Sequence, residues 1–125
     1  MALPNGRRAD ILALRPDGCF ACIEVKSGPR DFLTDLKWQA YREFADELFF
    51  AVDVDFPQDL LPVETGLIVS AGLEAELLRE APAHPLASAR RRALLHRFAL
   101  LAAARLAMAE DPAGVADIRA ALRVE

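Results

Sequence analysis

The sequence predicts an α/β fold, a mixed β-sheet with flanking helices, and three observations support this prediction. Near the N-terminus, two short apolar segments are joined by Pro16-Asp17-Gly18, a combination typical of a tight hairpin turn. Two further apolar segments, residues 48–52 and 66–70, follow a stretch with helical spacing. The last third of the chain has the apolar spacing of helices. A chain of 125 residues, 54% of them hydrophobic, is long enough for one domain over residues 1–125.

The predicted hairpin consists of strands over residues 8–14 and 19–26. A proline presets φ for a turn and Gly18 accepts a positive φ, so we expect a loop of three residues between the strands. A loop of that length pairs Arg15 with Cys19. Because side chains alternate along a strand, this register decides which residues of the two strands share a face.

The remaining elements are predicted from apolar spacing and from helix-end signals. A helix is expected to begin at Pro29, which suits a first helical turn, and to run to about Asp46. Its apolar stripe comprises Phe32, Leu33, Leu36, Ala40 and Phe44. The pair Asp111-Pro112 predicts the start of the last helix. The other expected elements are buried strands over residues 48–52 and 66–70, an edge strand over 75–80, and helices over 87–109 and 112–123 that pack on the core.

Composition argues against several classes of protein. The net charge of −4 disfavours indiscriminate, tight binding to nucleic acid, although a local basic patch remains compatible with it. No apolar run reaches the roughly 20 residues of a spanning helix, and the N-terminus has no secretory signal, so we expect no membrane association and a cytoplasmic location. Cys19 and Cys22 would point to opposite faces of a strand, which favours small core residues over a zinc or redox site.

Three charged residues are predicted to meet at one end of the hairpin. Glu24 and Lys26 share a face of their strand, and the register above sets Asp10 opposite Glu24. Two carboxylates suit a hard cation such as Mg²⁺ or Mn²⁺, and the backbone carbonyl of Val25 is a candidate further ligand. Such a cation activates water for phosphodiester hydrolysis, while a lysine orients the water or stabilises the transition state. The alternative is an ordinary cross-strand ion pair on a solvated face.

Several motifs surround this constellation. They are Arg8-Ala9-Asp10, Glu24-Val25-Lys26-Ser27 and Asp31-Phe32-x-x-Asp35-x-Lys37-Trp38-x-x-Tyr41, followed by Phe49-Phe50-Ala51-Val52, Phe56-Pro57, Gly66-Leu67-Ile68 and Ala89-Arg90-Arg91. Together they resemble the MmcB-like bacterial DNA-repair proteins of the PD-(D/E)XK nuclease superfamily, which also includes archaeal-type Holliday-junction resolvases. The resemblance implies a restriction-endonuclease-like core, with Asp10 and Glu24 as metal ligands and Lys26 as the catalytic lysine. Ala9 stands where the superfamily has proline, which leaves the carboxylate in place.

Further residues are candidates for supporting the site or for binding DNA. Trp38 either packs in the core or offers a stacking surface for a base. Lys37 and Tyr41 are interpreted as supporting residues of the active site. Phosphate contacts are a hypothesis for the basic residues, against a solvated charge run as the alternative. The candidates are Arg7, Arg8, Ser27, Lys37, Trp38, Tyr41, Arg90, Arg91 and Arg92.

The N-terminal segment predicts a truncated fold. Asn5-Gly6 is a strong signal for a type I′ hairpin turn, yet only residues 1–4 precede it. The superfamily that the chain resembles has a helix and a strand at this point. We therefore expect that an N-terminal helix and first strand are missing, which leaves the strand that holds Asp10 with an open edge. The alternative is that Pro4 blunts a natural edge.

The sequence therefore favours a Mg²⁺- or Mn²⁺-dependent DNA endonuclease that acts in DNA repair. The alternatives are a non-catalytic DNA- or protein-binding module that retains the nuclease fold, and a structural partner subunit. The sequence does not decide the DNA substrate, for which branched or damaged DNA is a candidate. It also leaves the oligomeric state open, with a dimer as one candidate.

Overall fold

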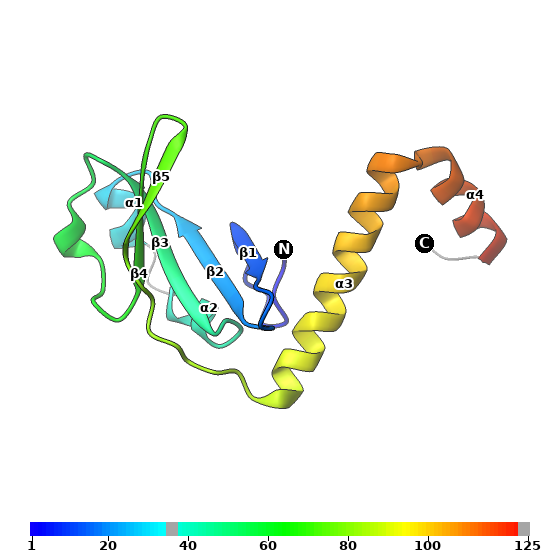
Figure 1. The fold of residues 1–125 in the computed structure, drawn as a ribbon, viewed down its shortest axis with the longest axis horizontal. Helices are drawn as coiled ribbons and strands as arrows, with labels where there is room; N and C mark the ends of the chain where they lie inside the picture. The colour runs from blue at the N-terminus through cyan, green and yellow to red at the C-terminus, as the bar shows by residue number, and fades with distance from the viewer. Residues whose placement is uncertain (35–37, 123–125) are drawn as a thin grey trace. The chain divides into compact units, whose positions relative to one another are not determined.

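The computed structural model describes residues 1–34 and 38–122, which form a mixed five-stranded sheet with helices (Figure 1). The strand order is β1-β2-β3-β4-β5, with antiparallel pairs at the two edges and parallel pairs between β2, β3 and β4. The strands are β1 (Ile11–Leu14), β2 (Phe20–Val25), β3 (Glu47–Asp53), β4 (Gly66–Ala71) and β5 (Glu74–Arg79). The helices are α1 (Pro29–Thr34), α2 (Gln39–Arg42), the short 3₁₀ helix η1 (Gln58–Leu60), α3 (Ser88–Glu110) and α4 (Pro112–Leu122). This arrangement confirms the predicted α/β class and the edge position of β5.

The predicted hairpin register is confirmed. The Arg15 N–H donates to the Cys19 carbonyl at 2.8 Å, and the Gly18 N–H donates to the Arg15 carbonyl at 2.9 Å, so the loop has three residues. Ile11 accordingly pairs with Ile23. Gly18 has φ 90°, a conformation that favours glycine.

The N-terminal segment also forms a hairpin with a three-residue loop, between Leu3 and Arg7. The type I′ turn that was predicted there is wrong. The Leu3 N–H donates to the Arg7 carbonyl at 2.6 Å and the Gly6 N–H to the Leu3 carbonyl at 3.0 Å, which encloses a three-residue loop. Ala2 forms a single antiparallel bridge with Arg8. Residues 1–3 therefore pair with the segment before β1, although only over one bridge and its flanking hydrogen bonds. Because this bridge is isolated, β1 begins at Ile11 rather than at the predicted residue 8.

The single helix predicted from Pro29 to about Asp46 is wrong in its extent. The structure has two short helices, α1 and α2, and Trp38 lies in a turn before the second. Residues 35–37 lie outside the described residues, and α2 ends at Arg42, short of the predicted Asp46. Of the predicted apolar stripe, Phe32 and Phe44 are buried and Leu33 is exposed, while Leu36 lies outside the described residues.

Two aromatic contacts place α1 and the start of α2 on one face of the sheet. Phe32 lies edge-on to Phe50 of β3 with ring centroids 5.4 Å apart, and Trp38 does the same at 5.8 Å. Phe50 is fully buried and shares this face with Glu24, its partner in β2. The face of the sheet that carries Glu24 is therefore the one that α1 and α2 cover.

The chain divides into two compact units, Met1–Arg91 and Arg92–Glu125. The N-cap prediction for α4 is confirmed, because the Gly114 N–H donates to the Asp111 carboxylate at 2.9 Å. Both α3 and α4 form close to their predicted positions. The expectation that they pack on the sheet as part of one domain stays a prediction.

Candidate functional site

Hydrogen bonds connect Asp10 with Glu24 and Val25 across the hairpin. The Asp10 N–H donates to Glu24 Oε1 at 3.2 Å, and the Val25 N–H donates to Asp10 Oδ2 at 2.9 Å. The chain bends at Asp10, just before β1, so its carboxylate reaches the backbone of β2. The predicted juxtaposition of the two carboxylates is therefore present, and backbone hydrogen bonds fix it.

Burial distinguishes the two carboxylates. Glu24 is only 3% exposed, whereas Asp10 is exposed. Burial, together with the negative charge of Asp10, raises the pKa of Glu24 to about 7, although the hydrogen bond from the Asp10 backbone opposes this shift. The Cys22 thiol lies 3.8 Å from Glu24 Oε1, and burial raises its pKa well above the usual range. Cys22 is thus an inert core residue, as predicted, and Glu24 is a buried carboxylate for which the positive charge of Lys26 offsets only part of the burial and of the negative charge of Asp10.

Lys26 follows β2, and both its backbone and its ammonium group contact other residues. Its N–H donates to the Ala51 carbonyl at 3.0 Å, which continues the pairing of β2 with β3 by one residue. Although it carries an ammonium group, the residue is only 7% exposed. Its Nζ lies 4.0 Å from Asp31 Oδ1, at the start of α1. The structure therefore brings Lys26 to the same end of β2 as Glu24, next to an acidic partner that the sequence analysis did not select.

The donor set at this end of β2 fits a hard divalent cation. Two carboxylates supply oxygen ligands, and a cation would stabilise the charged form of Glu24, whose pKa is raised by burial and by the negative charge of Asp10. Within residues 1–34 and 38–122, no three His, Cys, Asp or Glu side chains cluster as a metal cage. Mg²⁺ commonly binds through one or two carboxylates, with water and substrate phosphates as further ligands. The Val25 carbonyl as an added ligand stays a prediction.

The aromatic candidates contribute to packing around the site. Trp38 is 9% exposed, and the Arg42 guanidinium lies over its ring, 5.5 Å from the centroid. This burial favours the packing interpretation over base stacking. The Tyr41 hydroxyl donates to the Arg8 carbonyl at 3.2 Å, so Tyr41 supports the segment that leads to Asp10. Lys37 lies outside the described residues.

Arg90 and Arg91 lie at the other end of β2. Arg91 forms a two-point ion pair with Asp46 and donates to the Gly18 carbonyl at 2.8 Å. Asp46 in turn accepts from the N–H of Phe20, the first residue of β2. Arg90 donates to the Glu43 carbonyl at 3.0 Å and lies over the Phe44 ring. Both guanidinium groups thus make structural contacts, and their role in DNA binding stays a prediction.

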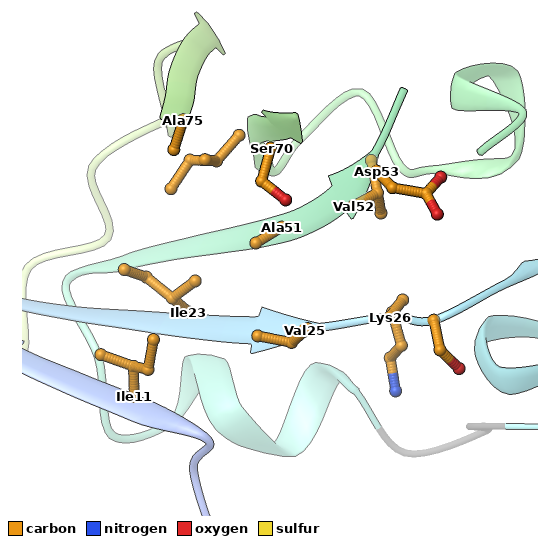
Figure 2. Close-up of a pocket in the computed structure, with 11 residues that line it drawn as sticks. Ile11, Ile23, Val25, Lys26, Ala51, Val52, Asp53, Ser70 and Ala75 are labelled. Atoms are coloured by element: carbon orange, nitrogen blue, oxygen red, sulfur yellow. The ribbon is translucent and has the colours of Figure 1, made fainter. Parts of the chain in front are cut away.

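The opposite face of the sheet carries a shallow apolar hollow of about 520 Å³ (Figure 2). Ile23 and Val25 alternate with Glu24 along β2 and therefore face away from it. Figure 2 shows the Lys26 ammonium pointing away from Ala51 and Ser70, so Lys26 lines the hollow while its charged end points away from it. Its lining residues are Ile11, Ile23, Val25, Lys26, Ser27, Ala51, Val52, Asp53, Ile68, Ser70 and Ala75.

Sequence reasoning missed the two acidic residues that organise the ends of β2. Asp31 entered the sequence analysis only as part of a family motif and with no role assigned, yet it contacts both Lys26 and Ser27. Its position four residues after Ser27 was the available signal, because that spacing reaches one helical turn back. Asp46 gave no signal, since its partner Arg91 is 45 residues away in the chain.

The fold and the site define an α/β protein whose mixed sheet carries a carboxylate pair and a buried lysine at one end of its second strand. This chain belongs to the MmcB-like family, described as DNA repair protein MmcB-like, whose family model matches residues 1–113. A solved structure from Silicibacter pomeroyi, titled a protein of unknown function, is similar at 47% sequence identity with a TM-score of 0.80. The similarity covers 87% of this chain and 75% of that one. No curated protein matches the chain. No helix among the described residues is long and apolar enough to cross a membrane.

Proposed function

We propose that this chain is a divalent-metal-dependent endonuclease that hydrolyses DNA phosphodiester bonds during repair. The observation that carries the proposal is the cluster of Asp10, buried Glu24 and buried Lys26 at one end of β2. Membership of a DNA-repair family supports DNA as the partner. The mixed sheet with its charged hairpin also supports a PD-(D/E)XK core.

Each residue has a distinct role in this proposal. Asp10 and Glu24 hold Mg²⁺ or Mn²⁺ through their carboxylate oxygens. When bound, this cation lowers the pKa of a water molecule and neutralises charge on the scissile phosphate. Lys26 orients the attacking water or donates a hydrogen bond to the phosphate oxygens. Tyr41 and Trp38 keep the surrounding backbone in place, because both are buried against it.

Local positive charge supports a DNA path past this end of the sheet. Arg7 and Arg8 lie three and two residues before Asp10 in the chain, and Arg30 lies in the first turn of α1. The net charge of −4 implies that such contacts are few, so binding should be weak and should fall steeply with salt. Replacing Arg7 and Arg8 by alanine should therefore reduce the salt dependence of DNA binding, while the cation site remains.

The direct test is cleavage of a panel of branched, nicked, single-stranded and duplex DNAs with Mg²⁺ or Mn²⁺. The wild-type protein should cleave at least one of them, and Lys26→Ala should lower its rate by about 100-fold or more, as expected for loss of a group that acts in the transition state. Lys26→Ala should keep its Mn²⁺ affinity, because the carboxylates are intact. No cleavage by a preparation that binds both Mn²⁺ and DNA would contradict the proposal and favour a non-catalytic binding module.

A further inference from the structure

The acidic residue at the start of α1 makes three contacts with the segment that carries the lysine. Asp31 Oδ2 accepts hydrogen bonds from the Ser27 N–H at 3.0 Å and from the Ser27 hydroxyl at 3.3 Å. Its other oxygen, Oδ1, lies 4.0 Å from Lys26 Nζ. One carboxylate therefore connects both the backbone after Lys26 and the lysine's charged end.

The contact between Asp31 and the Lys26 ammonium matters because the Lys26 side chain is buried. Its side chain is 8% exposed, whereas that of Asp31 is 43% exposed, so the ammonium depends on protein groups for much of its solvation. Lysine has a flexible four-carbon stem with many rotamers. The hydrogen bond to the Ala51 carbonyl fixes the Lys26 backbone, but it does not favour one side-chain rotamer over another. A carboxylate near Nζ favours the rotamers that keep the ammonium close to it.

We infer that Asp31 is a positioning residue, which aims the Lys26 ammonium at the position of the scissile phosphate through its contacts with Lys26 and Ser27. This inference rests on the proposed function. A purely structural role would be the stabilisation of the first turn of α1, since an acid there accepts backbone N–H groups. The two roles differ in one respect: positioning acts through Lys26, whereas helix capping does not.

The first experiment does not depend on catalysis. Lys26 and Lys37 are the only lysines in the chain, so ¹³C labelling of lysine Cε gives two sites, which the Lys37→Arg variant assigns. In the full-length protein, Asp31→Asn keeps an oxygen for Ser27 and removes the charge beside Lys26. We expect the Lys26 signal to shift and its side-chain motion to become faster. Thr34→Val, on the same short helix, is the matched control and should leave the Lys26 signal unchanged.

The second experiment is a double-mutant cycle on DNA cleavage in Mn²⁺. Asp31→Asn should lower kcat by about 10- to 100-fold, the usual effect of losing a group that orients an active-site residue, with Mn²⁺ affinity changed less than about twofold. In the Lys26→Ala background the same substitution should have no further effect on kcat. Equal losses in both backgrounds, or a Lys26 signal that Asp31→Asn leaves unchanged, would overturn the inference. Absence of any cleavage by the wild type would instead count against the proposed function, and the Lys26 signal would still decide the role of Asp31.

Discussion

The two ends of β2 each bury a carboxylate, and the two carboxylates have opposite properties. Asp46, 1% exposed, accepts hydrogen bonds from the N–H groups of Phe20 and Leu86 and from the Arg91 guanidinium. Burial opposes its ionisation, but Arg91 and these N–H groups prevail and lower its pKa. Glu24, 3% exposed, accepts one backbone N–H and faces a second carboxylate, and its pKa is raised to about 7.

The difference separates a structural site from a site that is available for a ligand. The donors around Asp46 are complete within the chain, so this end ties β2 to β3 and to the segment before α3. At the other end, Asp10 and Glu24 are both acceptors, and a cation is the partner that would satisfy both of them. Buried charge alone therefore does not mark a candidate functional site, whereas a carboxyl with a raised pKa beside a second carboxylate, which Lys26 offsets only in part, does.

The largest expected effect on stability is at the Asp46 end. Asp46→Ala should lower the free energy of unfolding by about 3–5 kcal/mol, because Arg91 and the N–H groups of Phe20 and Leu86 lose their partner. Urea unfolding measures this change, with Asp59→Ala in the exposed η1 helix as the control. A loss no larger than that of the control would show that the Asp46 cluster does not hold this end of the sheet.

The sequence could predict those contacts at the two ends of β2 that depend on local signals. The register that joins Asp10 to Glu24 follows from a Pro-x-Gly loop, in which φ preferences act over three residues. Asp46 and Arg91 meet only through the tertiary fold, so no spacing in the sequence predicts them. The turn at Trp38 and the end of α2 at Arg42 were also missed, because the apolar periodicity of the segment continues to Phe44.

The second prediction concerns pH and the Glu24 end. A carboxyl with a pKa raised from 4.5 to about 7 binds its proton more tightly in the folded state, so the metal-free protein should lose stability as pH rises from about 4.5 to 7. Glu24→Gln removes this effect and can still accept the Asp10 N–H. It should stabilise the metal-free protein by about 2 kcal/mol at pH 8, an advantage that disappears near pH 4. Urea unfolding across this pH range measures it, and destabilisation by Glu24→Gln at pH 8 would contradict the assignment.

The smallest predicted effect is at Tyr41. Tyr41→Phe removes the hydrogen bond to the Arg8 carbonyl and keeps the buried ring, so it should cost about 1 kcal/mol of stability. Thermal unfolding measures this loss. Because Arg8 lies two residues before Asp10, we also expect a modest weakening of Mn²⁺ binding. A stability loss without any change in Mn²⁺ affinity would limit Tyr41 to packing.

Calorimetric titration of Mn²⁺ into the metal-free protein tests the central claim most directly. The wild type should bind one class of Mn²⁺ site, and Asp10→Ala or Glu24→Ala should weaken the affinity by on the order of 100-fold while each variant stays folded. Asp53→Ala, which removes a carboxylate at the end of the neighbouring strand β3, is the matched control and should bind as the wild type does. Unchanged Mn²⁺ affinity in both Asp10→Ala and Glu24→Ala would contradict the account.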